Sequence, residues 1–384
     1  MQMPIRRLLA LAVPLALLVH APGAHPATDA ADAAPPDAWS SFRGTPSLRG
    51  VTRATLPDAP RLLWSFTTGG PVKSTAAIVD GLAVLGSDDG HVYALRMADG
   101  TKAWSFQTDG PVLSSPLIRD GRIFVGSAGT NFYALELATG KEVWRHGIDA
   151  EIKSSASPFA APDGKGTWLV FGGYDNRLHC LDAATGRSNW VYETGNYVHG
   201  VPAVGDGVTA FGGCDAIVHV VNLADGTLAR EIDGGAYIIG SAAIVDGFAY
   251  VGQYGNEFLA IDLAKGEVAW RYRDRNFPYG ASPAVTDQLV IFGGRDRRIH
   301  AVDRATGKAR WTFGTRGRVE SSPVVAGNRV IVGSDDGRIY LLDLDDGRER
   351  WSYEVGQAVQ SSPAVVQDRF VIGADDGVVY AFGR

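Results

Sequence analysis

The chain has 384 residues, of which 45% are apolar and 20% are charged, so it can bury a large core. Its formal net charge of −6 at pH 7 argues against the basic surface of a nucleic-acid-binding protein. The 48 glycines indicate many tight turns, as in an all-β protein.

The first residues have the pattern of an export signal. Arg6 and Arg7 precede an apolar run from Leu8 to Val19, and an alanine-rich stretch follows. A basic start before a short apolar run is typical of a secretory signal peptide, and the run is too short for an ordinary transmembrane helix. We expect a cleaved signal peptide at 1–27 and a leader at 28–60, with the cleavage site left open. Because no cysteine stands near the end of the run, we expect no lipid anchor and a periplasmic or secreted protein.

Tryptophan recurs along the chain with a period near 40 residues. Successive spacings are 40, 40, 46, 80, 41 and 40 residues, and the spacing of 80 covers two periods with Arg230 at the missing position. The spacing of 46 contains an insertion at 161–166. A fixed period of this length predicts a repeat protein with eight equivalent units. The tryptophans that follow this period are Trp64, Trp104, Trp144, Trp190, Trp270, Trp311 and Trp351.

Each unit contains four short apolar runs between Gly and Asp turns, as in 321–351. Short runs rich in β-branched residues are strands, and four strands in one period form a propeller blade. The last unit supplies only three strands, while 62–67 has no unit before it. We therefore predict an all-β, eight-bladed β-propeller of four-stranded blades over 61–384. Its ring is closed by the N-terminal strand, which completes the last blade.

The repeat motifs carry a family resemblance. The repeat unit has Ser-Ser-Pro, then Val-Gly-Ser-Asp-Asp-Gly, then Val-Tyr-Ala-Leu-Asp and a Thr-Gly turn before Trp, with individual units departing from it, and this pattern resembles the PQQ-like β-propeller repeat. The stretch at 38–44, Ala-Trp-Ser-Ser-Phe-Arg-Gly, is similar to a lead-in found before such propellers. The resemblance implies two kinds of relative. Quinoprotein alcohol dehydrogenases hold PQQ and calcium at the propeller axis, whereas BamB is a non-enzymatic scaffold in outer-membrane protein assembly.

Departures from the dehydrogenase pattern favour the BamB-like, non-enzymatic reading. The chain has no vicinal cysteine pair, no haem-attachment motif and no calcium-loop spacing, and its repeats are nearly bare. The recurring Asp-Asp-Gly turns suit tight hairpins. We expect no catalytic residue, no metal and no cofactor, with PQQ plus calcium as the alternative. Whether Cys180 and Cys214 form a disulfide stays open, because export permits one and two small buried side chains are the other reading.

The repeat is broken mainly on one face of the predicted propeller, and this face is the candidate binding surface. The connections between blades and the turns between second and third strands share one face, here called the upper face; the remaining turns share the lower face. On the upper face, blades 2 to 6 depart from the repeat and carry aromatic and arginine residues favoured in recognition patches. The alternative reading is packing between blades. The predicted binding-face residues are Tyr174, Arg177, Tyr197, His199, Tyr237, Tyr254, Phe277, Tyr279, Arg295 and Arg297.

A second set of candidates surrounds the axis. The residue just before each inner strand is expected to point near the axis, which gives a ring of Lys73, Leu113, Lys153, His199, Ile239, Gly280, Glu320 and Gln360. His199 has no nucleophile beside it in the sequence, so we read it as a polar lining of the channel mouth. His91, His179, His219 and His300 are expected at equivalent, structural positions on third strands.

These observations leave two main functional hypotheses, beside a third in which the repeat domain only stabilises a complex. The first is an exported, monomeric scaffold whose upper face docks a protein or peptide partner, without nucleic acid or a transmembrane anchor. The alternative is a binder of PQQ or another planar anion over the axis, using Lys73 and Lys153, or a minimal quinoprotein dehydrogenase. Glu320 is the only carboxylate of the axial ring, and a dehydrogenase needs a base beside the quinone.

Overall fold

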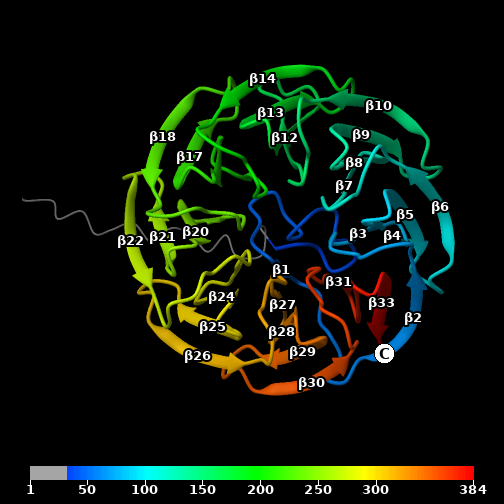
Figure 1. Cartoon of the computed structure of the whole chain (residues 1–384), viewed down its shortest axis with the longest axis vertical. Coiled ribbons are helices and arrows are strands. Elements are labelled where there is room, and N and C mark those ends of the chain that lie inside the picture. Colours follow the sequence, from blue (N-terminus) through cyan, green and yellow to red (C-terminus); the bar gives the residue numbers. More distant parts are fainter. Residues whose placement is uncertain (1–32) are drawn as a thin grey trace, which may run out of the picture.

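The computed structural model describes residues 33–384, so the predicted signal peptide lies outside the described residues. Eight blades of four antiparallel strands follow one another around a central axis, and a short fifth strand joins the sheet of blade 7 (Figure 1). Residues 33–384 contain no helix. The prediction of an all-β, eight-bladed propeller is confirmed.

The first four blades follow chain order, with each blade's strands given from the axis outward. Blade 1 contains β3 (Ala77–Val79), β4 (Leu82–Gly86), β5 (His91–Arg96) and β6 (Lys102–Gln107). Blade 2 contains β7 (Leu117–Arg119), β8 (Arg122–Gly126), β9 (Asn131–Glu136) and β10 (Glu142–Gly147). Blade 3 contains β11 (Ser157–Ala160), β12 (Thr167–Gly172), β13 (Arg177–Asp182) and β14 (Ser188–Glu193). Blade 4 contains β15 (Ala203–Gly205), β16 (Val208–Gly212), β17 (Ile217–Asn222) and β18 (Leu228–Asp233).

The last four blades repeat this arrangement. Blade 5 contains β19 (Ala243–Val245), β20 (Phe248–Gly252), β21 (Phe258–Asp262) and β22 (Glu267–Tyr272). Blade 6 contains β23 (Ala284–Val285), β24 (Leu289–Gly294), β25 (Arg298–Asp303) and β26 (Ala309–Gly314). Blade 7 contains β27 (Val324–Ala326), β28 (Arg329–Gly333), β29 (Arg338–Asp343) and β30 (Glu349–Glu354). Blade 8 contains β31 (Ala364–Val366), β32 (Arg369–Gly373), β33 (Val378–Gly383) and β2 (Arg61–Thr67).

The ring closes as predicted. β2 pairs antiparallel with β33, where Leu62 faces Phe382 and Trp64 faces Ala381. The N-terminal strand therefore completes the blade that the C-terminus begins, and no blade is left with an unpaired third strand.

The Ser-Ser-Pro motif joins neighbouring blades close to the axis. The Ser321 hydroxyl donates to the Ser361 carbonyl at 2.8 Å, and the Ser361 hydroxyl donates to the Ser74 carbonyl at 3.0 Å across the closure. The second serine accepts a backbone N–H from the preceding blade, as Ser362 does from Ser322 at 3.0 Å. The motif is thus explained by the fold, since it links the inner strands of neighbouring blades by hydrogen bonds near the axis.

The repeating tryptophan is explained by contacts between blades, as expected. Trp64 in blade 8 donates its indole N–H to the Met97 carbonyl of blade 1 at 3.1 Å. Its ring lies against Gly100 so closely that a Cβ there would come within 2.7 Å. Gly100 also has φ +73°, a conformation that suits glycine. Where the tryptophan is missing, the Arg230 side chain lies against the equivalent Gly266.

The segment before the closing strand covers the lower end of the axial channel. Its backbone bonds to the lower ends of the inner strands, for example from Ile118 N–H to Ser40 and from Ile244 N–H to Ser47. β1 (Val51–Thr52) pairs parallel with β27. In Figure 1 this part of the chain crosses the centre of the ring. The predicted leader therefore includes residues that pack as part of the propeller.

The lead-in motif at 38–44 holds this segment in place. Trp39 is fully buried, and Arg43 is 1% exposed. The Arg43 guanidinium donates to the carbonyls of Ser322 at 3.0 Å and Pro283 at 2.8 Å, and also to that of Pro323. Burial lowers the pKa of Arg43 to about 9, so the side chain stays charged at neutral pH. A buried cation is tolerated here because it supplies donors to carbonyls at the inner edges of blades 6 and 7.

Candidate functional site

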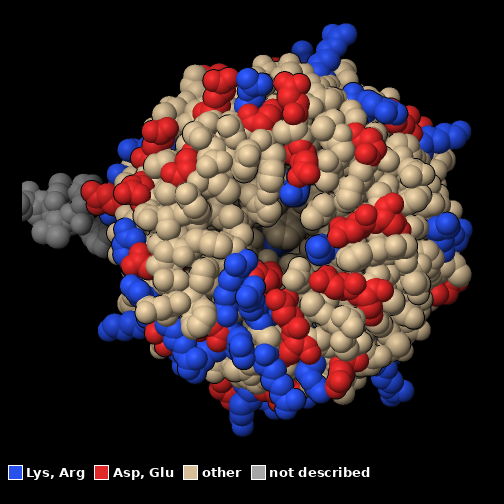
Figure 2. Space-filling model, viewed as in Figure 1, with Lys and Arg blue, Asp and Glu red and all other residues tan. Residues whose placement is uncertain are grey.

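The upper end of the channel is an open cavity of 210 Å³. Figure 2, which views the upper face, shows this hollow at the centre of the ring. Phe42 contributes to the lining from the N-terminal segment. The structure places all eight predicted axial residues in the wall: Lys73, Leu113, Lys153, His199, Ile239, Gly280, Glu320 and Gln360.

The charged axial side chains are paired with neighbours. The Lys73 ammonium lies 3.3 Å from Asp88, and the Lys153 ammonium lies 2.7 Å from Glu151. The Glu320 carboxylate accepts from Arg295 Nε at 2.7 Å. These pairs leave the cavity polar but without an excess of either charge.

A further polar axial contact is made by Gln360, which lies between Glu320 and Lys73 around the ring. The Gln360 amide donates to Asp335 Oδ1 at 3.3 Å. Burial raises the pKa of Asp335 and also that of Asp375, whose neighbours include Lys73. The Asp-Asp-Gly turns of blades 7 and 8 therefore take part in the channel rim.

His199, Tyr174, Tyr197 and Lys153 form one cluster at the mouth. The Tyr174 hydroxyl lies 2.5 Å from His199 Nδ1, and the rings of Tyr174 and Tyr197 stack with centroids 4.8 Å apart. The Lys153 ammonium lies 4.5 Å from the Tyr174 ring centroid. Burial raises the pKa of Tyr174 to about 12, whereas burial and then Lys153 lower the pKa of His199. Neutral His199 therefore accepts a hydrogen bond from the Tyr174 hydroxyl at Nδ1, and the proton stays on Tyr174.

Three aromatic side chains project from consecutive inter-blade connections on the upper face. Tyr197 is 46% exposed, Tyr237 is 59% exposed and Phe277 is 47% exposed. Within residues 33–384 they are the only aromatic side chains that are largely exposed. Side chains of this kind make large contact areas when a partner covers them.

Tyr254 and Arg295 continue this row toward the axis. The Tyr254 backbone N–H donates to the Tyr237 carbonyl at 2.9 Å, and the Arg295 guanidinium lies 4.8 Å from the Tyr254 ring centroid. Tyr254 is half-buried, and burial raises its pKa. The row from Tyr237 to Glu320 is therefore continuous.

Tyr279 does not belong to the exposed face. It is 1% exposed, its ring packs edge-on against Phe292 with centroids 5.2 Å apart, and its hydroxyl accepts the Asp274 backbone N–H at 3.2 Å. The expectation that Tyr279 is part of a docking surface was wrong. The equivalent position in the other blades holds a buried aliphatic residue that contacts a strand glycine; these residues are Val72, Val112, Ile152, Val198, Ile238, Val319 and Val359.

The remaining predicted arginines lie farther from the axis. Arg177 pairs with Glu193 at 3.2 Å across β13 and β14, where both side chains are exposed. Arg297 is exposed at the turn between β24 and β25, with φ +66°. Arg177 and Arg297 therefore lie in two different blades, 3 and 6, in the outer part of the upper face.

A pocket of 510 Å³ lies on the upper face beside Arg297. It is lined by Arg275, Phe277, Pro278, Arg295, Asp296, Arg297 and Arg318. Figure 2 shows basic side chains gathered over blade 6, next to acidic ones over blades 7, 8 and 1. Arg318 was missed in the sequence because its blade keeps the regular Asp-Asp-Gly turn; the connection that enters that blade, at 314–320, carries the signal.

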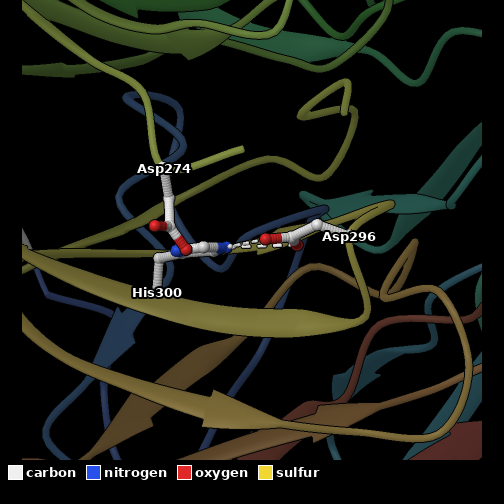
Figure 3. Close-up of side chains that lie close together, drawn as sticks. All are labelled: Asp274, Asp296 and His300. Atoms are coloured by element: carbon white, nitrogen blue, oxygen red, sulfur yellow. Dashed lines mark hydrogen bonds and ion pairs between the residues drawn. The ribbon is translucent and has the colours of Figure 1, made fainter. Parts of the chain in front are cut away.

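Asp274, Asp296 and His300 have ligand atoms within 4.8 Å of one another (Figure 3). His300 Nε2 lies 3.2 Å from Asp296, both side chains are fully buried, and Asp274 is engaged by Arg298 at 3.2 Å. The His–Asp pair recurs in blades 3 and 4 as His179 with Asp175 and His219 with Asp215. In blades 1, 7 and 8 a tyrosine replaces the histidine, as in Tyr93 with Asp89, Tyr340 with Asp336 and Tyr380 with Asp376.

This recurrence gives the buried pair a structural explanation, since an aspartate in the turn anchors a side chain four residues later. It also corrects the expected equivalence of the four histidines. His179, His219 and His300 share the repeat position, whereas His91 stands two residues before it, at the start of β5.

Both cysteines are free thiols in the structure. Cys180 is buried in β13, and burial raises its pKa to about 12. Cys214 lies in the turn of blade 4 and is partly exposed. This arrangement agrees with the interpretation of Cys180 and Cys214 as unpaired small side chains in neighbouring blades.

Comparison with known proteins identifies the family. A family profile described as outer membrane protein assembly factor BamB matches residues 49–162, 136–276 and 274–383. The chain belongs to this family. Among curated proteins, none matches the sequence significantly.

Solved structures share the propeller at low sequence identity. BamB from Moraxella catarrhalis matches with a TM-score of 0.69 and 20% identity, over 85% of this chain and 98% of that one. Quinohemoprotein alcohol dehydrogenase from Comamonas testosteroni matches with a TM-score of 0.73 and 14% identity, over 92% and 81%. The computationally designed Ika8 protein matches with a TM-score of 0.73 and 17% identity, over 84% and 100%. These similarities establish the shared fold.

The described chain has no membrane-spanning element of the helical kind. Residues 33–384 form no helix that is long and apolar enough to cross a membrane. The predicted binding-face and axial residues otherwise lie on the upper face, and their role in binding stays a prediction.

Proposed function

We propose that this protein is an exported binding scaffold whose upper face docks a protein partner through an extended segment. The observation that carries the proposal is the row of exposed aromatic side chains, Tyr197, Tyr237 and Phe277, on three consecutive connections. Isolated exposed aromatics are common, but a row of largely exposed rings on one face, where the repeat is broken, is typical of an interaction site. The BamB family membership supports a partner-binding role in the cell envelope.

PQQ with calcium, the alternative ligand, fits the axial cavity poorly. The cavity holds 210 Å³, whereas pockets for ligands of cofactor size start at roughly 300 Å³. Lys73 and Lys153, the cations that a quinone carboxylate would need, are already paired. Calcium takes roughly six to eight oxygen ligands, and Glu320 is engaged by Arg295. We therefore favour the binding scaffold over a PQQ-dependent enzyme.

Site-specific crosslinking in cells tests the scaffold directly. A photo-crosslinking amino acid replaces Tyr237 on the upper face or, as a matched control, the exposed Lys141 on the lower face. The proposal predicts one discrete adduct from position 237 and none from position 141. Equal adducts from both positions, or none from 237, contradict it.

Thermal unfolding with added PQQ and calcium tests the alternative. A ligand that binds only the folded state stabilises it by about 2.7 kcal/mol at a hundredfold excess over Kd. The scaffold predicts no shift in Tm. A clear upward shift, lost in Lys73→Gln and Lys153→Gln, contradicts the proposal and restores the axial cofactor.

A further inference from the structure

The pocket over blade 6 contains arginines that the fold leaves without partners. Within residues 33–384, Arg275, Arg297 and Arg318 form no ion pair, and all three are exposed. Arg295 completes the group, but Glu320 engages it at 2.7 Å. The concentration of positive charge is unusual in a chain with a net charge of −6.

The acidic group in this pocket does not neutralise it. Asp296 is fully buried and is bound to His300 at 3.2 Å. His300 therefore engages this carboxylate. The 510 Å³ pocket is lined instead by guanidiniums that form no ion pair within 4 Å in the described part of the chain, those of Arg275, Arg297 and Arg318. Arg318 also acts electrostatically on Asp335 in the channel rim. Guanidiniums at such a hollow favour planar oxyanions, because each can donate two parallel hydrogen bonds to a carboxylate.

We infer that this pocket is a carboxylate-recognition subsite that takes an Asp- or Glu-bearing segment of a partner protein. The inference rests on the proposed docking function and adds the chemistry of the partner. Phe277 forms part of the pocket wall and is 47% exposed, so it offers an apolar contact beside the charges. A segment in which acidic residues alternate with apolar or aromatic ones fits this combination.

The position of the pocket favours a chain segment over a free small anion. Arg295 lies 4.8 Å from the Tyr254 ring, and the Tyr254 backbone bonds to Tyr237. The pocket is therefore continuous with the aromatic row, so one extended segment can cover both. The acidic turns over blades 7, 8 and 1 repel the same carboxylates, which confines them to blade 6 (Figure 2).

Binding of defined peptides tests this inference. The probe is a fluorescein-labelled peptide Gly-Glu-Phe-Glu-Asp-Phe-Gly, and its control has Gln and Asn in place of the acids. By fluorescence anisotropy, the full-length protein should bind the acidic peptide about tenfold more tightly or better, with an affinity that falls as salt rises.

Two triple variants with the same change in net charge locate the site. Arg275→Gln with Arg297→Gln and Arg318→Gln should abolish the preference for the acidic peptide. Arg96→Gln with Arg310→Gln and Arg348→Gln removes exposed arginines near the lower face and should leave binding within about twofold. Equal losses in both variants would show general charge attraction and overturn the inference.

Two further outcomes overturn the inference by separate routes. If citrate or inorganic phosphate binds as tightly as the peptide, and Phe277→Ala has no effect on peptide binding, the pocket takes free anions. If the acidic peptide does not bind while crosslinking from position 237 persists, the carboxylate subsite is wrong and the docking face stands. If the crosslink from position 237 is lost while the acidic peptide still binds, the proposed docking function is wrong.

Discussion

The two ends of the axial channel are built on the same eight inner strands, but they are used differently. At the lower end, the N-terminal segment bonds to those strands and places the buried Arg43 against their carbonyls. At the upper end, a 210 Å³ cavity stays open and aromatic side chains such as Tyr237 stay exposed. The comparison teaches that the N-terminal segment is used to cover the lower end, whereas the upper end keeps its cavity and its aromatic side chains exposed.

The largest expected effect comes from breaking the closure that both ends depend on. Deletion of 61–67 removes β2 and leaves β33 as an open edge, so we expect loss of cooperative folding. Circular dichroism during thermal unfolding measures this. Appending the same seven residues after Arg384 through a short linker should restore the transition; a cooperative transition in the deletion itself would contradict the closure.

The next effect concerns the lower end alone. Arg43→Met removes a buried cation and leaves carbonyls of Ser322, Pro283 and Pro323 without their donor. We expect a loss of about 3 kcal/mol or more in the free energy of unfolding. Arg43→Lys should recover little, because an ammonium does not reproduce the planar guanidinium. Urea unfolding that is unchanged in Arg43→Met would show that the segment is not held by this residue.

A smaller effect separates packing between blades from backbone strain. Gly100→Ala forces a Cβ to within 2.7 Å of Trp64 at φ +73°, whereas Gly81→Ala has φ +75° and no atom within 4 Å. We expect Gly81→Ala to cost about 1 kcal/mol and Gly100→Ala about 2 kcal/mol more. Equal costs in chemical unfolding would mean that the tryptophan contact contributes nothing.

A group at the upper end, His199, should make the stability of the protein depend on pH. The pKa of His199 is lowered in the folded protein, so folding disfavours its protonated form. As pH falls below about 6.5, the unfolded chain binds this proton first and the folded state loses stability, down to the lowered pKa. His199→Gln should lose less stability over this range. Parallel pH profiles for the two proteins would contradict the pKa shift.

Much of the fold could be predicted because the same strand and turn pattern recurs in eight units. The tryptophan period, the three-strand last unit and the residue before each inner strand located the blades, the closure and the axial ring. The contacts of Arg43 could not be predicted, because its partners lie 240 to 280 residues away in the sequence. Such contacts depend on the path of the N-terminal segment across the assembled ring, which no local pattern in the sequence indicates.

The candidate site was predicted less completely. Tyr197, Tyr237 and Phe277 are exposed where the repeat breaks, but Tyr279 is buried because it occupies a position that is aliphatic in the other blades. The irregular sequence around Tyr279 suggested an exposed side chain, although its position in the repeat is one that is buried in the other blades. Arg318 was missed for the opposite reason, since it belongs to a regular blade and reaches the pocket of its neighbour.

The upper-face claim is tested most directly by a variant that should leave the propeller folded. Tyr197→Ala with Tyr237→Ala and Phe277→Ala removes exposed rings, so we expect the free energy of unfolding to fall by at most about 0.5 kcal/mol for Tyr237 and for Phe277. For Tyr197, whose ring stacks on Tyr174, we expect a loss of about 1 kcal/mol. With a photo-crosslinker at Arg177, also on the upper face, the adduct seen in the parent protein should disappear in this triple variant. An adduct that persists at the parent yield in the folded variant would contradict the account.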